Sequence, residues 1–395
     1  MKKILQSDVV ALGLAIFSML FGAGNLMYPL AVGMLSGSQV TIGMAGFLLT
    51  AICLPLLGIV AMILFNGDYQ AFFGRLGKRT SQLMIFICML TIGPMIAMPR
   101  IITLSHTMMT PFLPGRLFSA YGYMSSFLFA LLFLGITFLL AYRESKIVDI
   151  LGYVVSPLLL SSLAIIITKG FICAHTIIEN NEPAATIFLS NVMRGYETLD
   201  LLGTIFFSAI ILTILRSYAH NKNKTENELA IIGIKGGLIG IGLLGIVYLG
   251  MSMLGAYYGH GLADSNAGEL FREISLRVLG NHGALVIATA VLMACLSTSV
   301  ALSAVIAEYV QQTILNHRVW FVTALIITLI SCIPLSTAGL DYVIQLTGGV
   351  ITFVGYPTLI ALTLANIAYK LGGLKMVRIP VYATFFITLF AYYWW

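Results

Sequence analysis

The sequence predicts an all-α polytopic membrane protein with about eleven transmembrane helices in one transmembrane domain, residues 1–395. Of the 395 residues, 59% are hydrophobic and only 9% are charged, whereas a soluble domain carries about 25% charged residues. Apolar stretches of about 20 residues, the length of a membrane-spanning helix, recur along the whole chain. The first of them contains the stretch Ser18–Pro29, which places Gly22, Gly24 and Asn25 at membrane depth. So few charges do not cover a water-exposed fold of this size.

The apolar stretches and the loop charges define a topology. We place the spans at residues 9–33, 40–65, 82–109, 119–141, 147–170, 199–219, 230–256, 284–311, 319–335, 343–369 and 378–395. If the spans alternate, one side holds 15 of the 21 basic residues: Lys2, Lys3, Arg75, Lys78, Arg79, Arg143, Lys146, Arg216, Lys222, Lys224, Lys235, Arg318, Lys370, Lys375 and Arg378. The positive-inside rule then predicts a cytoplasmic N-terminus and, with an odd number of spans, an external Trp395. The net charge of +6 is therefore a topology signal, and we expect no nucleic-acid partner.

The spans divide into two blocks of five, residues 8–170 and 199–370, followed by an extra helix at 378–395. Because five is odd, the second block enters the membrane from the opposite side, as in an inverted-topology repeat. The two blocks share no visible residue similarity, so an eleven-span chain without a repeat fits the same layout. Residues 171–199, with Glu197 and the adjoining Asp200, and residues 257–283, with the amphipathic stretch 269–279, are predicted external loops. They either cover a vestibule or simply connect the spans.

The first span is predicted to be a broken helix. A glycine in a helix interior costs about 0.5–1 kcal/mol relative to alanine, and Gly22, Gly24 and Asn25 are followed by Pro29. Irregular backbone at membrane depth is tolerated only where it faces protein or a water-filled cavity. We therefore predict that the freed amides and carbonyls bind a ligand near the midplane, and that Asn25 caps the second half-helix or bonds across the break. The alternative is close helix packing through small residues.

Other polar residues within the spans are weaker candidates. The hydroxyls of Thr298 and Ser299 follow Cys295 in span 8 and suit a hard cation such as Na⁺, although such hydroxyls often bond their own backbone. Gly203, Phe206 and Phe207 in span 6 either line an apolar pocket or pack ordinarily. An arginine at membrane depth is a functional candidate, and we expect Arg100 to reach the outer leaflet and serve as a gate or packing ion pair rather than a substrate contact.

Enzymatic motifs are absent from the sequence. It contains no membrane-depth carboxylate pair, H-E-x-x-H, G-x-S-x-G or P-loop, so we predict that the protein is not an enzyme and that any pumping uses an ion gradient. A passive channel needs a continuous polar lining, which the apolar spans disfavour. Proton coupling is the closest alternative to sodium coupling, but the sequence indicates no buried carboxylate at the expected depth.

Five motifs resemble the bacterial branched-chain amino acid:cation symporters. They are F-S-M-L-F-G-A-G-N-L-M-Y-P in span 1, G-F-L-L-T-A-I-C-L-P-L-L-G in span 2, I-G-P-M-I-A-M-P-R in span 3, G-Y-E-T-L-D-L-L-G at span 6 and A-C-L-S-T-S-V-A-L in span 8. The resemblance implies a sodium-coupled importer of leucine, isoleucine or valine in the bacterial inner membrane. It also implies the five-plus-five inverted-repeat fold of the amino acid–polyamine–organocation superfamily, with helices 1 and 6 broken. Members of the family generally have twelve spans, so this chain lacks one outside the ten-helix core.

The resemblance also implies site residues. Sodium would bind between spans 1 and 8, at the carbonyls of Ser18, Phe21 and Cys295 and the hydroxyls of Thr298 and Ser299. The substrate carboxylate would meet the amides of Gly22, Ala23, Gly24 and Asn25, and its amino group the free carbonyls of spans 1 and 6. The apolar side chain would meet Phe206 and Phe207. Na⁺ is then the coupling ion, with no other cofactor and no obligate protein partner expected. Methionine or another apolar amino acid is an alternative substrate, because one methylene changes affinity by only about 1–3 kcal/mol.

Overall fold

The computed structural model describes residues 2–114, 123–142, 156–174, 177, 179–220, 226–259, 262 and 266–394. Every regular element in these residues is helical, as expected where lipid offers the backbone no hydrogen-bond partners. The predicted segments 119–122 and 147–155, Trp395, and the basic residues Arg143, Lys146, Lys222 and Lys224 lie outside the described residues.

A helix occupies each predicted span within the described part of the chain. In the first half these are α1 (Lys2–Leu20) with α2 (Ala23–Ser36), α3 (Val40–Ala51) with α4 (Cys53–Leu64), α6 (Lys78–Leu90) with α7 (Ala97–Met109), α8 (Tyr123–Ala141) and α10 (Ser156–Ile172). In the second half they are α11 (Ala184–Tyr196) with α12 (Asp200–His220), α13 (Glu226–Tyr258), α14 (Ala267–Tyr309), α15 (Phe321–Ser336), α16 (Leu340–Thr347) with α17 (Tyr356–Gly372), and α18 (Arg378–Trp394). Short elements connect them: η1 (Gly37–Gln39), α5 (Tyr69–Gly74), η2 (Thr91–Met95), η3 (Thr110–Phe112), η6 (Val310–Ile314) and η7 (Ile351–Gly355).

Most of the long apolar helices in the described residues are long enough for a bilayer. Seven helical stretches have the length and composition to cross a membrane. Three shorter apolar helices, Val9–Leu20, Pro157–Ile172 and Phe321–Ser336, fall within the predicted spans 1, 5 and 9. The helix Val9–Leu20 is separated by a break from the stretch that begins at Ala23. A count based on helix length therefore misses part of the first span.

The break in the first predicted span is present. The helix α1 ends at Leu20 and α2 begins at Ala23, and Gly22 between them is extended, with φ −113° and ψ −162°. The observed break is therefore shorter than the predicted unwound segment, Gly22 to Asn25, and begins one residue earlier. Phe21 and Gly22 form the break, whereas Asn25 lies in the first turn of α2.

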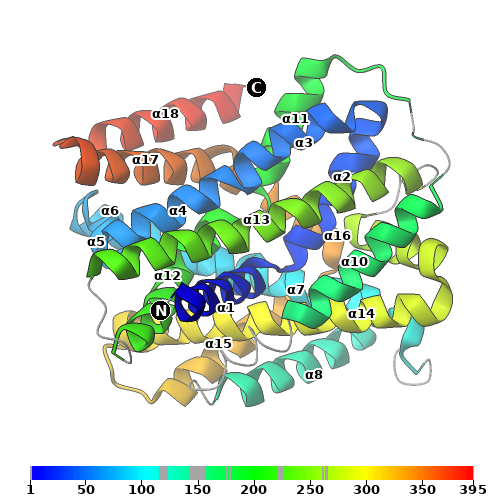
Figure 1. Cartoon of the computed structure of the whole chain (residues 1–395). Helices are drawn as coiled ribbons and strands as arrows, with labels where there is room; N and C mark the ends of the chain where they lie inside the picture. The colour runs from blue at the N-terminus through cyan, green and yellow to red at the C-terminus, as the bar shows by residue number, and fades with distance from the viewer. Residues whose placement is uncertain are drawn as a thin grey trace.

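The second broken helix begins in a segment that the sequence had placed in an external loop. Residues 184–196 form the helix α11, which packs against α3, and Figure 1 shows the two helices side by side. Residues 197–199 separate α11 from α12, and Leu199 there has a positive φ of 65°. The prediction of a loop up to Leu199 was wrong because α11 is short and carries polar residues, so its packing rather than its hydropathy makes it helical.

Close packing around α2 holds the break in place. The helix α13 lies along both α1 and α2. A Cβ at Gly33 would stand 1.7 Å from the carbonyl oxygen of Ser252, and one at Gly255 would stand 2.1 Å from that of Leu30. Only glycine permits such an approach of two backbones.

The long helix α14 also borders the break between α1 and α2. It packs against α7, α8, α10 and α15 and also contacts α1 and α2, and it runs along one side of the molecule in Figure 1. Its first part includes the predicted amphipathic stretch 269–279, which is helical after an Asn266 cap and ends at a kink at Gly280, φ 70°. The extra helix α18 packs on α17, away from this region (Figure 1).

Candidate functional site

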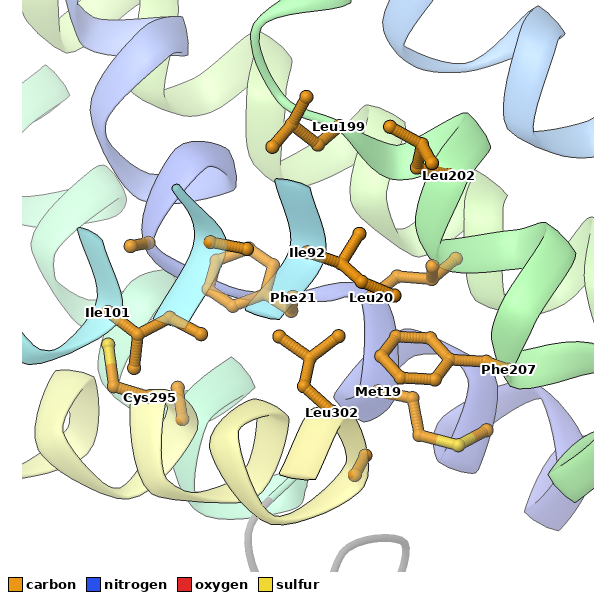
Figure 2. Packing of buried hydrophobic residues seen from close by; sticks show 14 of the residues in the cluster. Met19, Leu20, Phe21, Ile92, Ile101, Leu199, Leu202, Phe207, Cys295 and Leu302 are labelled. Carbon is orange, nitrogen blue, oxygen red and sulfur yellow. The ribbon is translucent and has the colours of Figure 1, made fainter. Parts of the chain in front are cut away.

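A cavity of about 40 Å³ lies where the two helix breaks face each other. Its lining comes from α1, α2, α7, α12 and α14 and their connections: Met19, Leu20, Gly22, Ala23, Gly24, Asn25, Ile92, Ala97, Arg100, Ile101, Thr198, Leu199, Asp200, Gly203, Phe207, Thr298 and Leu302. Figure 2 shows apolar side chains packed together in this region, with Leu20 and Phe21 at the break, Phe207 from α12 and Leu302 from α14. The lining thus combines apolar side chains with polar ones such as Arg100 and Asp200, and the predicted residues Gly22, Ala23, Gly24, Asn25 and Gly203 are all part of it.

Asn25 ties the two broken helices together. Its Oδ1 accepts a hydrogen bond from the amide of Gly22 at 3.1 Å, which fixes the entry into α2. Its Nδ2 donates to Oδ1 and Oδ2 of Asp200 at 2.9 and 2.7 Å, and it also bonds the hydroxyl of Tyr248 from α13. Asn25 therefore performs both of the roles predicted for it, as a cap and as a bond across the break.

Asp200 is the functional candidate that the sequence interpretation missed. It is 3% exposed, begins α12 and lines the cavity. Oδ2 also accepts a hydrogen bond from the Tyr248 hydroxyl at 3.0 Å. The expectation that no carboxylate is buried among the membrane helices was wrong, because α11, the first half of the second broken helix, had been read as a loop. An acidic residue in the first turn of an apolar helix is a usual helix-start signal, and here that signal marks a buried break.

Arg100 points into the protein, not toward a membrane surface. Its side chain is 4% exposed, and it donates through Nη1 to the Glu197 carbonyl at 2.6 Å and through Nη2 to the Thr198 carbonyl at 3.2 Å. Nη1 also lies 3.4 Å from the Tyr28 hydroxyl. The guanidinium therefore does not reach the surface of the protein, because the carbonyls that end α11 attract a cation and hold it at the cavity. Its predicted role as a gate or packing ion pair stays a prediction.

Hydroxyl groups of α14 contact the end of α1. The Thr298 hydroxyl donates to the Phe21 carbonyl at 3.2 Å, and the Ser297 hydroxyl donates to the Ser18 carbonyl at 3.2 Å. Ser18, Phe21 and Thr298, three residues implied for sodium, are thus adjacent, and Cys295 lies on the same helix, fully buried.

Ser299 faces elsewhere in this structure. Its hydroxyl lies 3.2 Å from that of Thr137 on α8 and 3.5 Å from Sδ of Met98 on α7. Successive helical residues turn by about 100°, so when Ser297 and Thr298 face α1, Ser299 faces α7 and α8. Ser297, which the sequence interpretation did not select, takes its place next to Ser18.

The two phenylalanines predicted to meet the substrate lie in different surroundings. Phe207 lines the cavity, whereas Phe206 stacks on Phe73 and lies against Tyr69 of α5, with centroids 5.9 and 5.2 Å away. Burial in this cluster raises the pKa of Tyr69 to about 12. Phe206 therefore joins the packing between α12 and the α4–α6 connection and is not part of the cavity wall, because neighbouring helical residues point about 100° apart.

Solved structures share the architecture of this chain. The chain superposes on MhsT in complex with L-phenylalanine with a TM-score of 0.65, at 16% identity over 97% of this chain and 98% of that one. It superposes on Mhp1, a nucleobase-cation-symport-1 family transporter in a closed conformation with bromovinylhydantoin bound, with a TM-score of 0.64 at 15% identity, over 98% and 92% of the two chains. The chain has this transporter fold, which confirms the predicted fold class.

The family follows from the sequence matches. Residues 5–392 match the family described as branched-chain amino acid transport protein, and the chain belongs to that family. The branched-chain amino acid permease BraB of Bacillus subtilis is 30% identical over 374 residues, covering 92% of this chain and 80% of the relative. The permease BrnQ of Escherichia coli is 29% identical over 367 residues, covering 91% and 80%. The predicted family is therefore confirmed.

Proposed function

We propose that this protein imports leucine, isoleucine and valine together with Na⁺ by alternating access. The observation that carries the proposal is the cavity between the two helix breaks, whose lining combines polar and apolar side chains. The relatives BraB and BrnQ are named as branched-chain amino acid permeases, and such a substrate has the same two-part character as the cavity.

The walls of the cavity support a mechanism that involves movement. A volume of about 40 Å³ holds a few waters, since one water needs about 10–15 Å³ on this measure, and it is too small for a leucine. Binding therefore requires α1, α12 and α14 to separate around Leu20, Phe207 and Leu302. A site that opens by moving helices against each other is what alternating access needs.

Sodium would bind where α14 meets the end of α1. Two oxygen pairs meet across the two helices: the Ser297 hydroxyl lies 3.2 Å from the Ser18 carbonyl oxygen, and the Thr298 hydroxyl lies 3.2 Å from the Phe21 carbonyl oxygen. Hard cations take oxygen ligands. A cation there would hold α1 against α14 and favour one conformation, while its loss would release α1. In this proposal the N-terminus is cytoplasmic and Trp395 external, in a bacterial inner membrane, as the loop charges predict.

Uptake into proteoliposomes tests the proposal. Radiolabelled leucine, isoleucine and valine are offered with an inward gradient of Na⁺, Li⁺ or H⁺ in turn, with the membrane potential clamped. We expect accumulation above equilibrium only with the coupling ion, and Na⁺ as that ion. Accumulation that ignores the Na⁺ gradient contradicts sodium coupling, and downhill flux alone with every gradient contradicts active transport.

A second candidate, proton coupling, is favoured by Asp200. A buried carboxylate in a membrane helix is a usual proton carrier, and Asp200 lines the cavity. The same assay separates the two: proton coupling predicts accumulation driven by an acidic exterior in the absence of Na⁺ and lost in Asp200→Asn.

A further inference from the structure

We propose that Arg100 and Asp200 recognise the two charged ends of the amino acid, Arg100 the carboxylate and Asp200 the ammonium group. This inference rests on the proposed function and adds two charged side chains to it. The two residues come from different broken regions, α7 beside the end of α11 and the start of α12, yet both line one cavity. Neither was selected from the sequence as a substrate contact.

The carboxylate end of the cavity combines two sources of positive potential. The first amides of α2, from Ala23 onward, have no acceptor within their own helix and carry the positive end of its dipole. The guanidinium of Arg100 stands directly beside them, since a Cβ at Gly24 would lie 2.9 Å from Nη2. A carboxylate placed here accepts bonds from amides and guanidinium together.

Arg100 has a donor left for that carboxylate. Nη1 and Nη2 are engaged by carbonyls and the Tyr28 hydroxyl, but the buried Nε has no hydrogen-bond partner within the described residues. A buried polar group without a partner is costly, and Arg100 belongs to the cavity lining, so we infer that a ligand entering the cavity accepts a hydrogen bond from it. Nε–H and the amides of α2 are both donors, which selects an anionic group.

The ammonium end is formed by Asp200. An ionised carboxylate offers about four acceptor positions, and three are used: Oδ1 by Asn25, and Oδ2 by Asn25 and Tyr248. Both partners are neutral and orient the carboxylate, and Arg100 of the same lining acts on it more weakly than these hydrogen bonds do. A buried carboxylate needs a cation, and the remaining position on Oδ1 suits one N–H of an ammonium group.

Two leucine analogues separate the roles of the two side chains. 4-Methylpentanoate is leucine without its amino group, and 3-methylbutylamine is leucine without its carboxylate. Purified full-length protein in nanodiscs is assayed by competition of leucine and both analogues against radiolabelled leucine at fixed Na⁺, with direct binding of radiolabelled 4-methylpentanoate as a second readout. In the wild type we expect both analogues to bind at least 100-fold more weakly than leucine, because each leaves one buried charge without a partner.

Each charge-neutral variant should lose its preference for leucine over one analogue. Asp200→Asn should bind leucine at least tenfold more weakly than the wild type and 4-methylpentanoate at least as tightly, so that the ratio of the two affinities falls at least tenfold. Arg100→Gln should likewise bind leucine at least tenfold more weakly and 3-methylbutylamine at least as tightly, so that the ratio of leucine to 3-methylbutylamine affinity falls at least tenfold. Exposed Arg318→Gln, and Asp68→Asn, which keeps a cap for α5, serve as matched controls and should keep both wild-type ratios.

Each other outcome overturns the inference or the function beneath it. Wild-type protein that binds no leucine, isoleucine or valine contradicts the proposed function. Asp200→Asn that keeps the wild-type ratio, or that instead changes only the Na⁺ or pH dependence of leucine binding, assigns Asp200 to ion coupling and overturns its ammonium role. A folded variant that binds neither leucine nor 4-methylpentanoate overturns it too, because 4-methylpentanoate makes no use of Asp200. A variant with a thermal transition well below the wild type shows a structural role, and the inference is then also rejected.

Discussion

Alanine in place of Gly24 tests how closely the Arg100 guanidinium packs on the break of helix 1. The new Cβ would lie 2.9 Å from Nη2 and 3.2 Å from both Cα and the carbonyl oxygen of Thr198. The backbone of Thr198 is held at the end of α11, so the guanidinium has to give way. Overpacking of this size costs about 1–3 kcal/mol, and at 1.4 kcal/mol per factor of ten we expect leucine affinity to fall about 5- to 150-fold.

Gly22→Ala is the matched control for this substitution. It lies two residues earlier in the same break, its φ of −113° suits alanine, and a Cβ there would meet Thr298 only at 3.4 Å or more. Binding of radiolabelled leucine to purified protein, with a thermal-unfolding scan of each variant, measures both effects. The reasoning is refuted if Gly24→Ala binds leucine within twofold of the wild type, or if Gly22→Ala loses as much affinity.

Three further predictions concern sodium, packing and selectivity. Thr298→Ala removes the hydroxyl that bonds the end of α1. It should raise the Na⁺ concentration for half-maximal uptake about tenfold, for one lost hydrogen bond of roughly 1 kcal/mol or more. Ser299→Ala should leave this Na⁺ concentration near the wild-type value, and equal effects of the two variants contradict the assignment of Thr298 to the sodium site. Gly33→Ala puts a Cβ 1.7 Å from a carbonyl of α13 and should lower the thermal transition or prevent folding, whereas Gly242→Ala, with nothing within 4 Å, should be neutral by fluorescence-detected size exclusion. Phe207→Ala enlarges the cavity beside its apolar lining. It should shift relative binding affinity toward amino acids with larger side chains by about 1–3 kcal/mol, as measured by competition. An unchanged affinity order of valine, leucine, methionine and phenylalanine argues against a lining role for Phe207.

Polar residues inside long apolar runs are informative in the sequence because lipid offers them no partner. This is why the break in helix 1 could be predicted from Gly22, Gly24 and Asn25 without any tertiary information. Thr298, by contrast, was placed beside the end of span 1 only by the resemblance to the branched-chain amino acid:cation symporters, because a hydroxyl in an apolar helix also bonds its own backbone.

Other site residues depend on which helix faces which, and the sequence does not show that. The helix α11 was read as a loop because it is short, and this error removed Asp200 from the membrane interior. Arg100 was expected to reach a membrane surface because its depth along α7 was known but its direction was not. Ser299 was chosen over Ser297 for the same reason, since a turn of about 100° per residue changes the neighbour of each hydroxyl.

The sequence by itself determined the membrane-embedded helices, their approximate limits and the break at Gly22, because hydropathy and backbone hydrogen bonding act within a few residues. Only the tertiary structure decided that the end of α11, the start of α12 and the start of α2 meet at one cavity. Their meeting depends on contacts between segments more than 150 residues apart, such as Asn25 with Asp200. The physical reason is that a charge buried in a membrane protein is stable only beside its partners, and those partners are brought together by the fold.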